Sequence, residues 1–212
     1  MILFLDTVSP IPEFSIIEGN KIIFSKIILN SSNEKMSDCI LPIYKQLDKR
    51  YSLRQNIKFL IITTGPGSYT ALRVGLAFFS GLSISMKIPL IGISCVEIFN
   101  LILDHKNSLT TALYIISSNN QKFIYLFDKK KQKYYGNKIE KNNSFHLFKK
   151  EKIIKILTNH TLDDNEFFTK KNNMSQIISF KKIILKNIKQ IILLANGKPI
   201  KLIYISNNQI LN

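Results

Sequence analysis

The fold is decided by residues 59–75, Phe-Leu-Ile-Ile-Thr-Thr-Gly-Pro-Gly-Ser-Tyr-Thr-Ala-Leu-Arg-Val-Gly, and by Pro-Leu-Ile-Gly-Ile at 89–93. This pattern predicts a strand at 58–63, a tight turn, a helix over 69–86 and a second strand at 90–93. The two apolar runs do not alternate with polar residues, which indicates strands covered on both faces. Two such strands joined by a helix form a parallel, right-handed β-α-β unit.

The turn between the first strand and the helix consists of Gly65, Pro66 and Gly67, and Ser68 is placed to cap the helix. Glycine tolerates positive φ, proline fixes its own φ, and serine is a favoured cap. Backbone N–H groups at a helix start can also cradle a phosphate, but the Gly-Lys-Ser/Thr of a Walker loop does not follow. We therefore expect a structural turn, with a phosphate cradle as the alternative.

Helical periodicity divides the residues of 69–86 between two faces. The residues expected to face the sheet are Ala71, Gly75, Phe78 and Leu82, with Gly75 allowing close backbone approach. The residues expected on the outside are Arg73, Leu76, Ala77, Ser80 and Ile84. Because this helix is apolar around almost its whole circumference, its outer side needs a cover. That cover is either a second layer of this chain or a partner protein.

A second apolar helix is expected behind Ser31 and Glu34, whose spacing fits a capping box. Its apolar positions fall on one arc and are Met36, Cys39, Ile40, Ile43, Tyr44 and Leu47. The arc is about 140° wide at ~100° per residue, which exceeds a minimal core stripe. It is wide enough to serve both the sheet and a neighbour.

Several of these segments match one family in order. They are Ile-Leu-Phe-Leu-Asp-Thr at 2–7, the segment 35–47 with its internal Ile-Leu-Pro, Gly-Pro-Gly-Ser-Tyr-Thr-Ala-Leu-Arg-Val-Gly-Leu-Ala at 65–77 and Ile-Pro-Leu-Ile-Gly-Ile-Ser at 88–94. Together they resemble the TsaB (YeaZ) family, the non-catalytic partner in bacterial synthesis of threonylcarbamoyladenosine on tRNA. The resemblance is dense over residues 1–100 and thins beyond them to traces at 117–125 and 199–206.

The resemblance implies an α/β, two-lobed, actin-like and sugar-kinase-like ATPase fold of the ribonuclease-H-like kind. The order of elements in the first lobe also favours a mixed sheet, with three antiparallel strands followed by parallel additions. We expect an N-terminal lobe at 1–106 and a smaller, eroded C-terminal lobe at 107–212. In the second lobe the patterns predict strands at 111–117, 122–128 and 200–205 and helices at 145–150 and 175–194, the latter stopped by Gly197.

For function, the resemblance implies a scaffold that binds a TsaD-like catalytic subunit and, with a TsaE-like ATPase, supports threonylcarbamoyl transfer to adenosine in tRNA. It also implies a homodimer in the partner's absence. Both contacts would be four-helix interfaces, and the expected contact residues are Met36, Ile40, Ile43, Tyr44, Leu47, Arg73, Leu76, Ala77, Ser80 and Ile84. The alternative is a nucleotide-binding phosphotransferase or hydrolase that uses Asp6 and the Gly65–Gly67 turn. The missing phosphate and adenosine loops favour the scaffold.

Few residues have the pattern of a catalytic or metal site. Asp6 ends a strand without an evident second carboxylate or catalytic lysine, so we expect it to bond neighbouring backbone amides. The histidines share no ligand spacing, and Cys39 and Cys95 are expected to be reduced thiols. The catalytic TsaD relatives carry paired metal histidines on the first long helix, where this chain has Met36. We predict neither catalysis nor a metal or cofactor.

The chain carries a net charge of +16. Such a charge attracts nucleic acid, but the lysines are spread and do not alternate with aromatic residues as a base-stacking surface would require. We favour compositional drift over a main tRNA-docking surface and expect at most a weak or indirect tRNA contact. The absence of a long apolar run and of a basic leader predicts a cytoplasmic protein without a membrane span.

Overall fold

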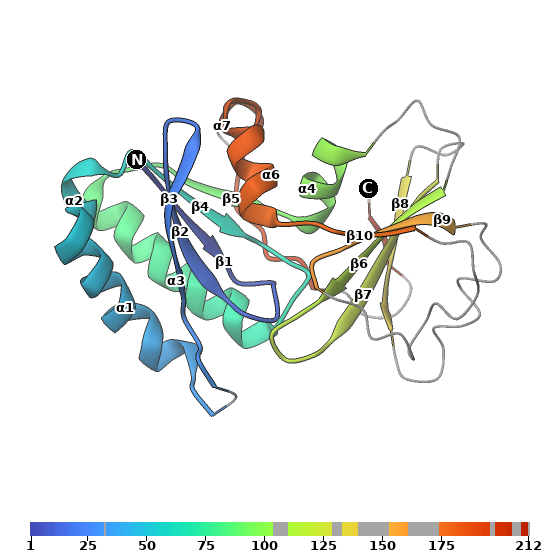
Figure 1. The fold of residues 1–212 in the computed structure, drawn as a ribbon, viewed down its shortest axis with the longest axis horizontal. Coiled ribbons are helices and arrows are strands. Elements are labelled where there is room, and N and C mark those ends of the chain that lie inside the picture. Colours follow the sequence, from blue (N-terminus) through green and yellow to red (C-terminus); the bar gives the residue numbers. More distant parts are fainter. Residues whose placement is uncertain are drawn as a thin grey trace.

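Two β-sheets lie side by side along the long axis of the molecule (Figure 1). The computed structural model describes residues 1–31, 33–103, 110–128, 133–139, 153–160, 174–195, 198–204 and 209–211. The first sheet has the strand order β3-β2-β1-β4-β5 and the second has the order β10-β9-β6-β7-β8-β11. None of the helices described is long and apolar enough to cross a membrane.

The elements of the first sheet all come from the first half of the chain. They are β1 (Ile2–Asp6), β2 (Glu13–Glu18), β3 (Lys21–Ile27), α1 (Met36–Tyr51), α2 (Leu53–Asn56), β4 (Phe59–Thr63), α3 (Tyr69–Met86), β5 (Leu90–Ile93) and α4 (Cys95–Ile102). Strands β1, β2 and β3 pair antiparallel, whereas β1, β4 and β5 pair parallel. This arrangement confirms the predicted mixed sheet and, with it, the predicted fold class.

The second sheet is built from the rest of the chain. Its strands are β6 (Thr110–Ile116), β7 (Lys122–Asp128), β8 (Lys133–Ile139), β9 (Ile153–Thr158), β10 (Met174–Ile177) and β11 (Gln209–Leu211), and the helices α6 (Phe180–Lys186) and α7 (Ile188–Ala195) follow β10. The β6–β7 hairpin confirms the strands predicted at 111–117 and 122–128. Strand β9, which pairs parallel with β6, had no clear signal in the sequence.

Helices cover both faces of the first sheet. On one face, α1 and α3 bury Leu5, Tyr44 and Phe79 in one apolar cluster. On the other face, Phe4 and Ile184 belong to a second cluster to which α4, α6 and α7 contribute. Figure 1 shows α6 and α7, in red, above the first sheet although they come late in the chain. The second cluster also contains residues of β6 and β7, so it joins the two sheets.

The division into lobes at 106/107 stays a prediction, because that boundary lies outside the described residues. Helices α6 and α7 belong by sequence to the second lobe but pack against strands of the first sheet. The C-terminal half therefore supplies, together with α4, one of the two layers that cover the N-terminal sheet.

Two local structures follow from short signals in the sequence. The β2–β3 hairpin turns at Gly19, which has a φ of +57° and precedes Asn20 in a typical two-residue hairpin turn. Helix α4 starts with a capping box, in which the Ser94 hydroxyl accepts from the Glu97 N–H at 3.1 Å and the Glu97 carboxylate accepts from the Ser94 N–H at 2.8 Å. Both signals act within a few residues of the chain.

The capping box predicted at Ser31 and Glu34 is wrong. Helix α1 begins at Met36, behind Lys35, whose side chain makes no cap bond. The Glu34 carboxylate instead accepts from the Asn30 N–H at 2.6 Å. The loop before the helix thus uses the acidic residue that the capping box would have needed.

The single helix predicted over 175–194 is also wrong. Strand β10 occupies its start, where the Ile178 N–H donates to the Thr158 carbonyl at 2.7 Å. Asn187 then separates α6 from α7, because its side-chain amide donates to the Ile183 carbonyl at 2.8 Å and caps the end of α6. The predicted strand at 200–205 is irregular backbone as far as Tyr204, and both the helix at 145–150 and the stop at Gly197 lie outside the described residues.

Candidate functional site

The turn between β4 and α3 is buried, and the segment 198–204 contacts it through Ile203. Residues 64–68 are all buried. The Gly65 carbonyl accepts from the Cys95 N–H at 2.9 Å, and the Thr64 carbonyl accepts from the Ile203 N–H at 2.8 Å. Gly65 has a φ of +112°, and a Cβ there would lie 2.5 Å from the Ile203 carbonyl oxygen. A phosphate could reach this turn only by displacing residues 198–204.

Asp6 is buried at the end of β1, and the loop behind it occupies both carboxylate oxygens. Its Oδ1 accepts from the N–H groups of Val8 and Ser9 at 2.9 and 3.1 Å. Its Oδ2 accepts from the Ser9 hydroxyl at 2.6 Å. Burial raises the pKa of Asp6 above its ordinary value, although these hydrogen bonds act in the opposite direction. The carboxylate closes a loop of the chain's own backbone.

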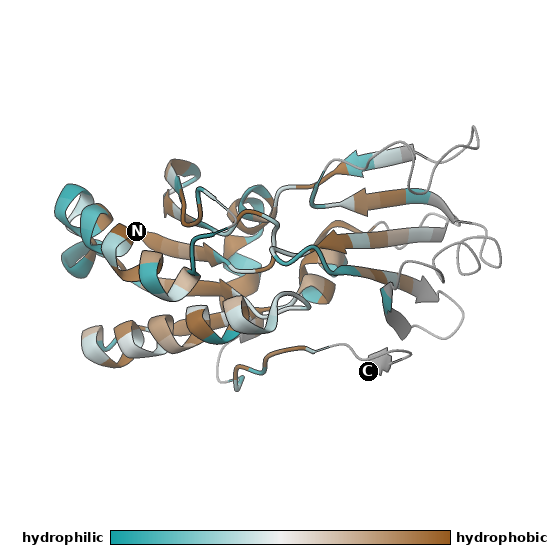
Figure 2. Cartoon of the chain, turned by 90° about the horizontal axis from the view of Figure 1, so that it is seen from below, coloured by the Kyte–Doolittle hydropathy of each residue, from teal (hydrophilic) through white to brown (hydrophobic). Residues whose placement is uncertain are grey.

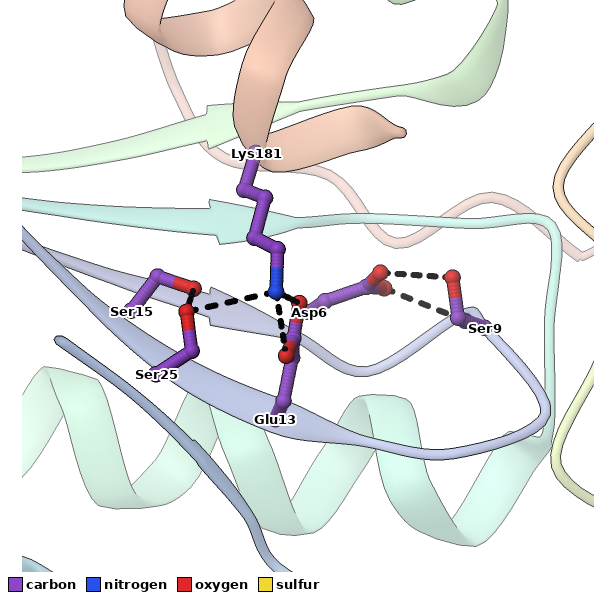
Figure 3. A network of polar contacts seen from close by, with 6 residues as sticks. All are labelled: Asp6, Ser9, Glu13, Ser15, Ser25 and Lys181. Atoms are coloured by element: carbon purple, nitrogen blue, oxygen red, sulfur yellow. Dashed lines mark hydrogen bonds and ion pairs between the residues drawn. The ribbon is translucent and has the colours of Figure 1, made fainter. Parts of the chain in front are cut away.

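Two charged residues lie beside Asp6 that the sequence analysis did not place there (Figure 3). Glu13 pairs with Asp6 across the β1–β2 ladder. Lys181 reaches down from α6 to Glu13 Oε1 at 2.8 Å and to the Ser25 hydroxyl at 3.2 Å. The ammonium and the Glu13 carboxylate neutralise each other, and both are largely buried. This ion pair fixes α6 to the β2–β3 hairpin.

Helix α3 presents a row of small and apolar side chains away from the sheet. Its exposed residues include Arg73, Ala77, Gly81, Ile84 and Ser85, and its buried residues are Ala71, Leu72, Gly75 and Phe79. Ile84 exposes 78% of its surface. Seen from below, α3 is pale to brown along most of its length, whereas α1 carries several teal positions (Figure 2). The outer side of α3 is therefore unusually apolar.

The inner side of α3 is rotated relative to the prediction. Leu72 and Phe79 are fully buried, whereas Phe78 and Leu82, expected to face the sheet, are half-buried. Phe78 packs against Tyr44 of α1 at 5.4 Å between ring centroids. A Cβ on Gly75 would lie 2.5 Å from Thr7 Cγ2, so the helix backbone approaches the sheet closely there. Leu76 and Ser80, expected outside, are half-buried, and Leu76 contacts the core.

The apolar arc of α1 lies inside the chain. Met36, Ile40, Ile43, Tyr44 and Leu47 are all buried. The Tyr44 hydroxyl lies 3.8 Å from the sulfur of Met86, so the arc packs against the sheet and against α3. These side chains line the core of the isolated chain. Leu41, 46% exposed, is the large apolar side chain that α1 does present. Which residues meet a partner stays a prediction.

A cavity of about 370 Å³ opens on the other face of the sheet, among β5, α4, α7 and residues 198–203. Its lining is mainly aliphatic, and Asp6 is not part of it. The Glu97 carboxylate in its wall already accepts from the N–H and the hydroxyl of Ser94, each at 2.8 Å. Among the described residues, no group of three or more His, Cys, Asp or Glu side chains could hold a metal ion.

Comparison with known families identifies the chain. The model of the family TsaD, tRNA N6-adenosine threonylcarbamoyltransferase, matches residues 27–199. The chain belongs to the TsaD family. Within this family it is similar to the tRNA threonylcarbamoyladenosine biosynthesis protein TsaB of Buchnera aphidicola, with 24% identity over 172 residues, which is 79% of this chain and 72% of that protein. The TsaB (YeaZ) resemblance found in the sequence is thereby confirmed, and the TsaD family assignment supports a role in tRNA threonylcarbamoyladenosine biosynthesis.

Other relatives match over shorter regions. The tRNA N6-adenosine threonylcarbamoyltransferase of Carboxydothermus hydrogenoformans is 28% identical over 98 residues, 45% of this chain and 29% of that enzyme. YeaZ from Pseudomonas aeruginosa matches with 14% identity and a TM-score of 0.44 over 60% of this chain and 59% of that structure. An uncharacterised protein with similarity to peptidase YEAZ, from the same organism, matches with 16% identity and a TM-score of 0.45 over 60% and 58%. The chain spans less than two thirds of both solved structures and of the transferase.

Proposed function

We propose that this chain is a non-catalytic, cytoplasmic subunit that binds a TsaD-like transferase. Together with a TsaE-like ATPase, the pair would transfer threonylcarbamoyl to adenosine in tRNA. The observation that carries the proposal is the exposed row Ala77, Gly81 and Ile84 on α3, beside Leu41 on α1. We call Ala77, Gly81 and Ile84 the α3 row.

The α3 row suits contact with another helix. Residues four apart form the ridges by which helices pack, and small side chains permit a short distance between helix axes. Ala77, Gly81 and Ser85 follow this spacing and are all exposed. On α1, Leu41 precedes Tyr44 by three residues and so lies on the flank that Tyr44 turns toward α3. Two adjacent helices thus offer one continuous surface, which could also join two copies of this chain when the transferase is absent.

The non-catalytic part of the proposal rests on Asp6 and the Gly65–Gly67 turn. An enzyme that used them would need side-chain or backbone groups that are free to bind the phosphates of a nucleotide. The carboxylate oxygens of Asp6 accept from Val8 and Ser9, and residues 198–204 cover the turn. Lys181 is neutralised by Glu13. These contacts support a scaffold rather than a phosphotransferase or hydrolase.

The proposal is tested by mixing the purified chain with a TsaD-like subunit and measuring the mass of the eluting species by size exclusion with light scattering. We expect a joint species whose mass exceeds that of either protein. A homodimer of the chain alone should dissociate as that species forms, because both contacts use the α3 row. Independent elution at concentrations of about 10 μM, far above a typical nanomolar affinity, would refute the partner assignment.

A further inference from the structure

A cluster of aromatic and guanidinium groups lies where α3 begins, beside the covered turn. The rings of Tyr69 and Tyr204 are 5.0 Å apart between centroids, at an interplanar angle of 43°. The guanidinium carbon of Arg73 lies 3.9 Å from the centre of the Tyr69 ring. Tyr204 follows Ile203, whose N–H bonds the Thr64 carbonyl. The fold therefore joins two distant segments into one cluster, which we call the tyrosine–arginine cluster.

The cluster faces solvent although it is rich in aromatic surface. Tyr69 is 49% exposed, Tyr204 is 39% exposed, and Arg73 is exposed as well. The Arg73 guanidinium, like that of any arginine, is charged at every physiological pH, and a hydrogen bond with Tyr204 raises its pKa further. Tyrosine, with one apolar and one polar end, is enriched at the surfaces through which proteins bind ligands and partners.

The surroundings of the cluster are basic. Lys198 and Lys201 are exposed on the segment that carries Tyr204. Residues 64–73 and 198–204 contain no Asp or Glu. Glu97, which shares the cavity wall with Lys198 and Lys201, is engaged by Ser94. A negatively charged ligand would therefore meet only positive charge on these two segments.

We propose that the tyrosine–arginine cluster stacks an unpaired base of single-stranded RNA, while Lys198 and Lys201 contact the flanking phosphates. Aromatic rings and guanidinium planes are the surfaces on which proteins stack splayed-out RNA bases. Lysines beside such a surface supply the salt-dependent part of the affinity. The inference deepens the proposed function, on which it rests for naming tRNA as the RNA concerned.

The cluster and the α3 row occupy different ends of the same helix. Arg73 precedes Ile84 by eleven residues, which is about 16 Å along the helix axis. Ala77 follows Arg73 by only four residues, but Tyr69 lies about 18 Å along the axis from Gly81, so a partner helix centred on Gly81 and Ile84 would leave Tyr69 accessible. Through this cluster the subunit would hold an unpaired segment of the RNA close to the bound transferase.

The test compares two labelled oligomers of equal length and charge, by fluorescence anisotropy with the isolated full chain. One is an oligoriboadenylate of about eight nucleotides, a length within the usual range of single-strand sites, and the other is its abasic counterpart. We expect the wild type to bind the oligomer with bases more tightly. Tyr204→Ala should weaken that binding about fivefold or more and leave the abasic oligomer unaffected. Tyr204→Phe, which keeps the ring, should retain the preference.

Two further variants serve as controls. Tyr51→Ala removes the tyrosine of a second arginine–tyrosine contact among the described residues, in which Arg50 lies 5.3 Å from the Tyr51 ring, and should change neither affinity. Lys201→Ala should weaken the binding of both oligomers to the same extent and reduce the salt dependence of binding by about one phosphate contact. The preference of the wild type needs no substitution, so it can be measured even if Tyr204→Ala loosens the segment 198–204.

Equal binding of the two oligomers by the wild type would overturn the proposal, and so would a preference that survives Tyr204→Ala. If Tyr69→Ala and Arg73→Ala instead abolish binding to the TsaD-like subunit and leave the oligomers unchanged, the cluster is a protein contact and the RNA assignment is wrong. The proposed scaffold function would survive that result. The contact between the α3 row and the transferase is tested separately, by substitutions in that row, and that test does not involve RNA.

Discussion

Ile84 is the residue whose replacement should separate partner binding from folding. It lies near the end of α3 with 78% of its surface exposed. Ile84→Asp should therefore change the free energy of unfolding by no more than about 0.5 kcal/mol, as surface substitutions usually do. Burial of an isoleucine side chain by a partner contributes about 1.5–3 kcal/mol. At ~1.4 kcal/mol per tenfold change, losing it weakens binding about 10- to 150-fold, and a carboxylate stranded in the interface weakens it further.

The measurement is isothermal titration of the variant with a TsaD-like subunit, alongside its thermal melting curve. Leu193→Asp is a matched control, because Leu193 on α7 is also 78% exposed but lies on the opposite face of the first sheet. We expect Ile84→Asp alone to lose affinity, with both variants melting near the wild type. Unchanged affinity of Ile84→Asp, or an equal loss in Leu193→Asp, would refute the assignment of the α3 row.

Three other predictions concern the packing and chemistry behind this surface. Gly75→Ala should lower the free energy of unfolding, measured by urea denaturation, by about 1–3 kcal/mol, because its Cβ would lie 2.5 Å from Thr7 Cγ2. Gly81→Ala has open space around its Cβ and should raise the free energy of unfolding by about 0.5–1 kcal/mol. Equal effects of the two substitutions would show that the helix is not packed closely against the sheet at Gly75. The pKa of Asp6 in the folded state is raised above 3.8, so the contribution of Asp6 to the free energy of unfolding is complete below that pH and is lost as the pH rises through the folded-state pKa. The stability of the wild type should therefore fall relative to that of Asp6→Asn over that pH window. A parallel pH dependence of the two proteins would contradict this prediction. Calorimetry should detect no ATP binding at micromolar concentrations, and a site that disappears in Asp6→Ala would contradict the non-catalytic assignment.

The first sheet could be predicted because its signals are local. Gly19 marks a hairpin through its own backbone, and Ser94 and Glu97 cap a helix three residues apart. Strand β4, helix α3 and strand β5 begin and end within one residue of the predicted bounds. The failure at Ser31 has the same origin, because a capping-box spacing also fits a loop in which Glu34 bonds Asn30.

The second half of the chain was harder because its pattern is ambiguous. The apolar run over 175–194 fits one helix by periodicity, yet pairing of β10 with β9 takes its start into a sheet and Asn187 divides the remainder. Neither event has a signal within the run itself. Pairing with a distant strand outweighs local helical preference there.

The sequence predicted only those contacts around Asp6 that residues close to it in the chain make. Asp6 bonds Val8 and Ser9, as a strand-end aspartate was expected to do. Glu13 could have been placed beside Asp6 from the register of the first two strands, but Lys181 arrives from α6, far along the chain. Tyr204 likewise joins Tyr69 only through the fold. Of the α1 arc, the sheet and α3 bury every member except Cys39, which is half-buried.

Reconstituted modification of tRNA tests the central claim most directly. A TsaD-like transferase and a TsaE-like ATPase, supplied with a threonylcarbamoyl donor and tRNA, are assayed for threonylcarbamoyladenosine with and without this chain. The account predicts strong product formation only when the chain is present, its loss with Ile84→Asp, and none from the chain alone. Full activity without the chain, or product from the chain without the transferase, would contradict the account.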